Sequence, residues 1–224
     1  MRRVLVAAVL CMSACTLRAQ DDFAKEILGA TGVSGGLIVH LDCGDGKLTA
    51  ALRANDKYLV HGLDMDPEQV AEAHEHVCSL GLYGRVSVDT FDGRRLPYVD
   101  NLVNLIVADQ LGGVTMEEVM RVLAPLGVAY VRRNGKWQET VKQRPEGVDE
   151  WTHYLYNASG NAVSRDRQVG PTRYLKWVAD PLWSRSHEYT PSLAAMVSAG
   201  GRIFSIHDDG VRGVTDQRIG DVES

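Results

Sequence analysis

The residues best suited to chemistry are the glycines of one turn and an acidic residue that follows them. The turn occupies residues 42–46 and contains Gly44 and Gly46, and Asp64 lies about 20 residues beyond Gly44. Glycines let the backbone approach a ligand closely, and a carboxylate at this spacing can accept both hydroxyls of a ribose. The arrangement predicts half of a nucleotide-binding fold. The alternative is that the turn only links a buried strand to a helix.

Two apolar strands must hold that turn and that acid in place. The sequence predicts strands over residues 37–41 and 58–63, joined by a helix over residues 47–53. A second helix begins after Asp66, which has the side chain of a capping residue, with Pro67 in the first helical position.

The alternation of strand and helix continues to residue 131. Strands are predicted over residues 86–88, 102–108 and 128–131. The middle one is almost continuously apolar, which is typical of a strand buried on both faces of a parallel sheet. Thr115 and Glu118 cap a helix before the last strand. Right-handed crossovers then predict the fold class, an α/β doubly wound Rossmann-like sheet.

After the fifth strand the pattern changes. Residues 138–150 are polar and are predicted to be a linker, and residues 151–224 are predicted to form antiparallel β structure. Strand-like pieces at 174–178 and 195–198 are separated by Pro, Gly and Ser, and the glycine pair at 200–201 predicts a hairpin.

The composition is that of a globular protein. Of 224 residues, 45% are hydrophobic and 24% are charged, and the net charge is -5. This length suffices for one or two domains. A basic surplus that would favour nucleic acid is lacking, so nucleic acid is not an expected partner.

The first 20 residues differ from the rest. Arginines at positions 2–3 precede an apolar run over residues 4–14, and residues 17–19 offer a small-residue cleavage site. We therefore expect a signal peptide over residues 1–20, an α/β domain over residues 21–137, and export to the periplasm or cell envelope. The apolar run is too short for a transmembrane span.

Three cysteines have alternative predicted roles. Residues 12–15 resemble a lipobox, in which case Cys15 would carry a lipid anchor instead of being removed with the leader. Cys43 is predicted to pack in the turn and Cys78 beneath its helix, and a disulfide between them is the alternative in an exported protein.

A metal site is not predicted. His74 and His76 are two positions apart on a helix and point away from each other. His187 and His207 could form a cluster with the acids of residues 208–210, but that segment is explained more simply as a turn between strands.

Four landmarks occur in order between residues 35 and 131. They are the glycine turn Cys43–Gly46, the acid Asp64, the pair Asp92–Gly93, and a helix and turn over residues 118–125. In this order they resemble a class I S-adenosylmethionine-dependent methyltransferase. The resemblance implies that S-adenosylmethionine is the cofactor, that Asp64 holds its ribose, and that the last pair reads adenine. The residues that it places at the cofactor are Asp42, Cys43, Gly44, Gly46, Asp64, Met65, Asp92 and Gly93.

The chain departs from that family at four positions. In the preferred alignment His40 replaces the acid at the strand end, and Asp42 replaces the first glycine, beside the methionine part of the cofactor. A carboxylate there repels the cofactor's own carboxylate by about 1 kcal/mol in water. In an alternative register Asp42 is itself the family acid. Asn104 and Leu126 replace an acid and a glycine.

The catalytic residue is not predicted. Little room follows residue 137 for the family's last two strands or for a lid over a substrate. Asp109 could orient a nucleophile, and the alternative is that it is a solvated acid at a strand end.

Residues 149–210, above all 151–154 and 198–204, resemble the opening of a quinoprotein-type β-propeller, as in exported bacterial proteins that join such a propeller to a methyltransferase-like domain. The chain holds at most one blade, so we expect a fragment whose open blade edge could associate with another chain. Pyrroloquinoline quinone would bind only if the missing blades exist. Trp151, Trp177 and Trp183 could line a sugar-binding face or pack within a blade.

Three functions follow from these patterns. The first is an S-adenosylmethionine-binding domain of methyltransferase type in an exported protein. The second is a degenerate, non-catalytic scaffold or interaction module attached to a propeller. The third is a fragment of a quinone-dependent oxidoreductase.

Overall fold

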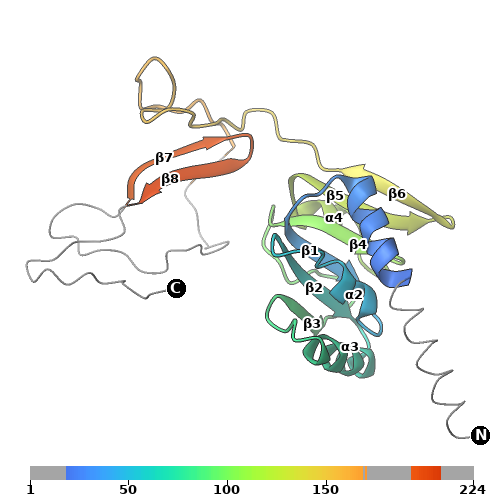
Figure 1. Cartoon of the computed structure of the whole chain (residues 1–224). Helices are drawn as coiled ribbons and strands as arrows, with labels where there is room; N and C mark the ends of the chain where they lie inside the picture. Colours follow the sequence, from blue (N-terminus) through green and yellow to red (C-terminus); the bar gives the residue numbers. More distant parts are fainter. Residues whose placement is uncertain (1–18, 169, 171–192, 208–224) are drawn as a thin grey trace, which may run out of the picture. The chain divides into compact units, whose positions relative to one another are not determined.

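The structure is a computed structural model that describes residues 19–168, 170 and 193–207. It divides the chain into two compact units, Met1–Arg144 and Pro145–Ser224 (Figure 1). The predicted leader up to residue 18, which includes Cys15, and the strand predicted at 174–178 lie outside the described residues.

The first unit, called the α/β unit below, is built on a six-stranded sheet in the order β3-β2-β1-β4-β5-β6 (Figure 1). β1 to β5 pair in parallel, and β6 runs antiparallel to β5. This order is that of a doubly wound nucleotide-binding sheet, and it confirms the predicted fold class. The strands are β1 (Gly36–Leu41), β2 (Tyr58–Asp64), β3 (Val86–Thr90), β4 (Val103–Ala108), β5 (Leu123–Arg133) and β6 (Lys136–Val141).

Helices cover both faces of the sheet, and three of the four described helices connect parallel strands. They are a helix over residues 19–31, α2 (Lys47–Ala51), α3 (Pro67–Ser79) and α4 (Met116–Val122). The predicted caps are confirmed. Asp66 accepts the Glu68 amide before α3, and Thr115 accepts the Glu118 amide before α4. None of the described helices is long and apolar enough to cross a bilayer.

Alternate residues of the central strands pack into two apolar layers, one on each face of the sheet. Ile38 and Val60 face the helix over 19–31 and α3, whereas Val39 and Ile106 face α4. These side chains are fully buried. Because successive residues of a strand point to opposite faces, a continuously apolar strand is what a sheet covered on both sides requires.

β6 extends the sheet through residues that the sequence analysis assigned to the linker. Residues 138–141 pair with β5, and just before them the ring of Trp137 stacks on Tyr130 with centroids 5.0 Å apart. The linker prediction was wrong here because β6 is an edge strand whose side chains are mostly exposed, so its sequence lacks apolar alternation. The α/β unit therefore ends at Arg144, and not at residue 137.

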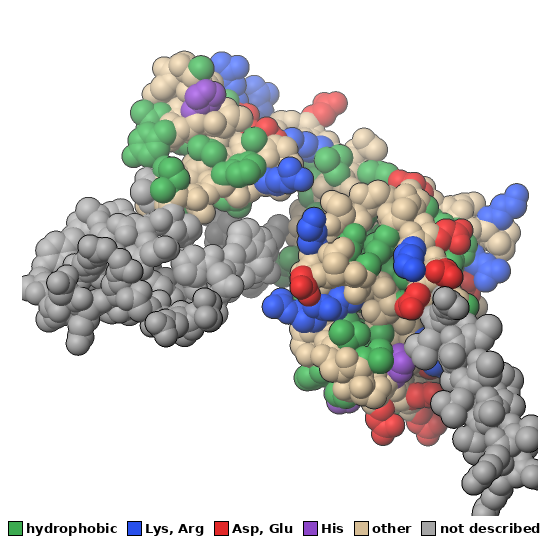
Figure 2. Space-filling view, viewed as in Figure 1, with side chains coloured by type: hydrophobic (Ala, Val, Ile, Leu, Met, Phe, Trp, Pro, Cys, Tyr) green, Lys and Arg blue, Asp and Glu red, His purple; other side chains and the backbone are tan. Residues whose placement is uncertain are grey.

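The described part of the second unit contains the predicted hairpin. β7 (Leu193–Ala199) pairs antiparallel with β8 (Arg202–His207) across a glycine turn. Trp151 joins this hairpin through its backbone, which exchanges hydrogen bonds with Ser198. Its ring packs against Tyr156, so in this structure Trp151 serves packing. Trp177 and Trp183 lie outside the described residues. Hydrophobic side chains are exposed over this unit in Figure 2.

Candidate functional site

The candidate site lies where the strand order reverses. From β1 the chain proceeds through β2 and β3 on one side of the sheet, and then through β4 and β5 on the other. Ligands of doubly wound sheets bind outside the carboxyl ends of the strands at such a switch point. Loops that leave the first four strands surround a cavity of about 100 Å³ at this point.

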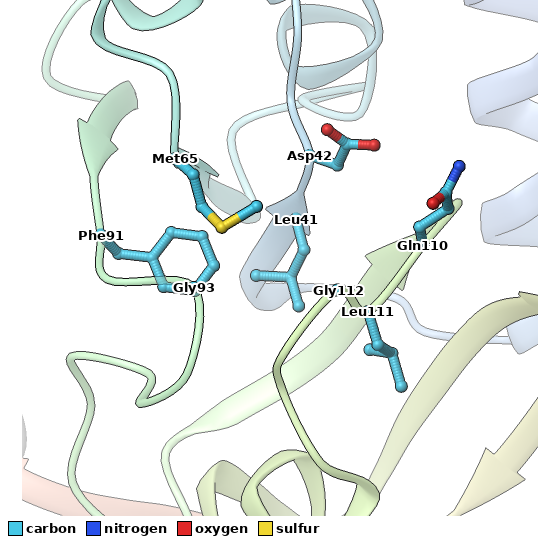
Figure 3. A pocket seen from close by; sticks show the side chains of 8 residues that line it. All are labelled: Leu41, Asp42, Met65, Phe91, Gly93, Gln110, Leu111 and Gly112. Carbon is cyan, nitrogen blue, oxygen red and sulfur yellow. The ribbon is translucent and has the colours of Figure 1, made fainter.

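Two kinds of side chain line the cavity. Figure 3 shows Met65 and Phe91 on one side and Asp42 and Gln110 on the other. We call Met65, Phe91 and Gly93 the apolar pole, and Asp42 with Gln110 the polar pole. The full lining is Leu41, Asp42, Met65, Phe91, Gly93, Gln110, Leu111 and Gly112.

Asp42 has the backbone conformation of a glycine. Its φ of 59° lies in the left-handed region, which Asp and Asn tolerate better than most residues. This conformation favours the alignment that places Asp42 at the family's first glycine. Burial raises the pKa of the Asp42 carboxyl, and the nearby charges of Asp64 and Asp109 raise it further.

His40 lies at the end of β1, just before the polar pole, and it is buried. Its Nδ1 is 2.8 Å from the hydroxyl oxygen of Thr49. Burial lowers the pKa of His40 to about 4, although the charges of Asp64 and Asp45 act in the opposite direction. The ring is therefore neutral at pH 7 and does not substitute for an acid at this strand end.

Asp64 ties two turns together. It is 6% exposed, and its two carboxylate oxygens accept the backbone amides of Gly44 and Asp66, each at 3.0 Å. In this structure Asp64 lies behind the cavity and not among its lining residues. Each carboxylate oxygen has two lone pairs, so Asp64 retains the capacity to accept a ligand hydroxyl.

The apolar pole depends on a close contact between Met65 and Gly93. A Cβ atom on Gly93 would lie 2.1 Å from the sulfur of Met65, so any side chain at position 93 would displace Met65 from this contact. Met65 itself is 58% exposed. Its unbranched side chain therefore covers the cavity without being locked in place.

The two glycines of the turn have different structural roles. Gly46 has a φ of 74°, and a Cβ on it would lie 2.9 Å from the Cα of Ala73 in α3. Gly44 has a φ of 52°, a Cβ on it would lie 3.9 Å from Oε1 of Gln69, and its amide donates to Asp64. Gly46 thus serves helix packing, whereas an added Cβ at Gly44 meets no close contact, and neither glycine lines the cavity.

Comparison with known proteins agrees with this geometry. Residues 38–127 match a methyltransferase domain. All eight residues that line the cavity fall inside that match. The α/β unit is referred to below as the methyltransferase-type domain.

Individual relatives cover only part of the chain. A stretch of 120 residues is 34% identical to methyltransferase GfsG of Streptomyces halstedii, covering 49% of this chain and 42% of that protein. A stretch of 108 residues is 33% identical to DNA damage-binding protein 1a of Arabidopsis thaliana, covering 48% of this chain and 9% of that protein. The chain thus spans less than half the length of either relative.

Among solved structures, the chain is similar to a SAM-dependent methyltransferase from Aquifex aeolicus. The TM-score is 0.43 and the sequence identity is 24%. The similarity covers 48% of this chain and 62% of that one.

Cys43 and Cys78, the two cysteines among the described residues, are both free. Cys43 packs in the turn as predicted, against Ala73 and Val88, and burial raises the pKa of its thiol to about 12. Cys78 was predicted to pack beneath α3, and this was wrong, because its position on the helix turns it toward solvent. The predicted alternative of a disulfide between them is not formed in the structure.

Two predicted acids have local partners. Asp92 accepts the amides of Arg94 and Arg95, each at 2.8 Å, and these bonds lower the pKa of its carboxyl. Asp92 is exposed beside Gly93 and does not line the cavity. Asp109 forms an ion pair with Arg132 at 3.0 Å, which fits a strand-end acid better than a nucleophile-orienting one.

Sequence reasoning missed five of the eight residues that line the cavity. Leu41, Phe91 and the segment 110–112 were not predicted as ligand contacts. The available signal was positional, because Phe91 directly follows β3 and residues 110–112 follow β4, where carboxyl strand ends meet.

Within the described residues, no three His, Cys, Asp or Glu side chains lie close enough together to hold a metal ion. His187 and residues 208–210, which the sequence analysis considered as a cluster, lie outside that part of the chain. Figure 2 shows positive and negative side chains interspersed over the visible face of the methyltransferase-type domain.

Proposed function

We propose that the methyltransferase-type domain binds S-adenosylmethionine in the switch-point cavity and presents its methyl group to an acceptor. The observation that carries this proposal is the coincidence of two independent features. The cavity stands at the carboxyl ends of the strands, and every residue of its lining falls within the matched methyltransferase domain, residues 38–127.

The two poles suggest how the cofactor would lie. Adenine fits the apolar pole, where Met65 and Phe91 offer polarizable and aromatic surface. The methionine end would then extend toward Asp42 and Gln110. Between these ends the ribose would lie closest to Asp64, whose oxygens already hold the adjoining turns.

Binding requires the cavity to widen. Small-molecule pockets usually measure about 300–1,000 Å³, against about 100 Å³ here. Met65 is the side chain whose movement would open it, because it is exposed and unbranched.

The first test is a calorimetric titration of S-adenosylmethionine and S-adenosylhomocysteine into the purified chain. Micromolar binding is expected. Asp64→Asn should weaken it by about tenfold or more, as expected for a lost hydrogen bond to a charged group. The matched control is Asp66→Asn, which removes an equal charge two residues away and keeps a good capping side chain.

Because Asp64 also supports two turns, Asp64→Asn alone does not separate a lost ligand contact from a disturbed fold. The substitution is therefore combined with a change in the ligand. Replacing S-adenosylhomocysteine by its 2′-deoxy analogue should weaken binding to the parent chain and have little further effect on Asp64→Asn. Equal losses in both proteins would show that Asp64 acts only on the fold. No binding of any nucleoside at millimolar concentration would overturn the proposal.

A non-catalytic scaffold is the second candidate. It is favoured by the small cavity and by Asp42, which places a charge where a glycine would admit the cofactor. The same titration decides between the two, because a scaffold would bind none of these nucleosides.

We propose export on the strength of the leader over residues 1–20, which lies mostly outside the described residues. Fractionation of cells that express the full chain tests this directly. A propeller with its quinone remains a proposal that rests on sequence resemblance, since the described part of the second unit includes a single hairpin.

A further inference from the structure

The polar pole of the cavity carries one sign of charge. Asp42 is the only ionisable side chain among the eight lining residues. Asp64 and Asp109 lie close enough for their charges to act on Asp42. The positive charge next to this group, Arg132, is already paired with Asp109. The part of a ligand that enters the polar pole therefore meets a negative electrostatic potential. None of the eight lining residues carries a positive charge that would offset it.

The backbone fixes the position of that charge. Asp42 follows β1 directly, and its left-handed conformation is held by the turn that Gly44 and Asp64 stabilise. Figure 3 shows its carboxylate on the same side of the cavity as Gln110, away from Phe91. A nucleoside with its base at the apolar pole would point its 5′ substituent at Asp42.

S-Adenosylmethionine carries both an ammonium and a carboxylate on that substituent. Asp42 attracts the first and repels the second, and the cavity wall offers the carboxylate no positively charged partner. Gln110 can donate a hydrogen bond to either an uncharged or a charged group, so it does not reverse this preference.

We propose that the site prefers adenosyl nucleosides whose 5′-thio substituent carries an amine and no carboxylate, as in the decarboxylated form of the cofactor. This inference rests on the proposed function, because it concerns the same cavity and the same nucleoside orientation. It changes the class of ligand from an amino acid conjugate to an alkylamine conjugate.

The test compares three probes by calorimetry at pH 8. S-Adenosylhomocysteine has both charged groups, S-adenosyl-3-thiopropylamine has only the amine, and 5′-methylthioadenosine has neither. The pH is set high because burial and the neighbouring acids raise the pKa of Asp42. The thiopropylamine is expected to bind at least about tenfold more tightly than S-adenosylhomocysteine, with 5′-methylthioadenosine weaker than the amine.

Two variants test whether the preference for the thiopropylamine comes from Asp42. Asp42→Asn keeps the size of the side chain, tolerates the same backbone conformation, and should bring the affinities of the two charged probes to within about twofold. Asp45→Asn removes an equal charge from the same turn but does not line the cavity, so the tenfold preference should persist.

The outcomes separate this inference from the function on which it rests. If none of the three probes binds at millimolar concentration, the proposed function fails. If S-adenosylhomocysteine binds as tightly as the thiopropylamine or more tightly, the nucleoside site stands and the carboxylate-free preference is overturned. A preference that persists in Asp42→Asn also overturns it, because the charge would then come from elsewhere.

Discussion

Lowering the pH from 7 to 4 is expected to reduce the free energy of unfolding by about 3 kcal/mol through His40 alone. His40 is buried and has a pKa of about 4 in the folded chain, compared with 6.5 for an unperturbed histidine. Between these values the unfolded chain binds a proton that the folded chain does not. Stability from this residue is therefore complete above pH 6.5 and is lost as the pH falls toward 4.

The measurement is urea unfolding of the parent chain and of His40→Gln at pH 7, 5.5 and 4.5. Carboxylates titrate in the same range, so the informative quantity is the difference between the two proteins at each pH. The parent should lose about 2–3 kcal/mol more than His40→Gln by pH 4.5. His74→Gln, which replaces an exposed histidine on α3, should follow the parent. Parallel pH curves for all three proteins would contradict a buried, neutral His40.

Gly46→Ala is expected to destabilise the chain by about 3 kcal/mol, and Gly44→Ala by only about 1 kcal/mol. Both positions have positive φ, so both substitutions carry the cost of a left-handed alanine. Only at Gly46 would the new methyl group collide with the backbone of α3, at Ala73. That backbone can move only by displacing α3, whose Ala73 and Val77 are buried against the rest of the unit.

Each glycine variant serves as the control for the other, because both positions lie in the same turn and both substitutions add one methyl group. Urea unfolding at pH 7 gives the two free energies, and their difference isolates the collision with α3. Equal destabilisation would mean that α3 can shift at little cost. That result would remove the packing reason for a glycine at position 46.

Much of the fold could be predicted because its signals are local. Apolar runs gave the central strands, and the capping side chains of Asp66 and Thr115 marked where two helices begin. β6 was not predicted because an exposed edge strand needs no apolar alternation. Cys78 was placed wrongly because an apolar residue type was taken to mean a buried position, whereas it lies on the solvent side of α3.

The site was less predictable, because much of its geometry depends on contacts between distant segments. The sequence indicated that Asp64 would stand at a strand end, but not that its oxygens would already hold the amides of Gly44 and Asp66. Nor could residue types show that Asp42 and Leu126, at positions where the resemblance places glycines, would adopt a backbone conformation typical of glycine. Both have positive φ, at 59° and 65°. The conformation is set by the turn as a whole and not by the residue within it.

The double hydrogen bonding of Asp64 has a consequence for motion. One carboxylate fastens the turn after β1 and the turn after β2, so neither can be displaced without disturbing the other. A ligand that forms a hydrogen bond with Asp64 would therefore loosen or tighten both turns together. The rates of hydrogen exchange at the amides of Gly44 and Asp66 should consequently change together. These two rates therefore indicate whether a ligand occupies the cavity.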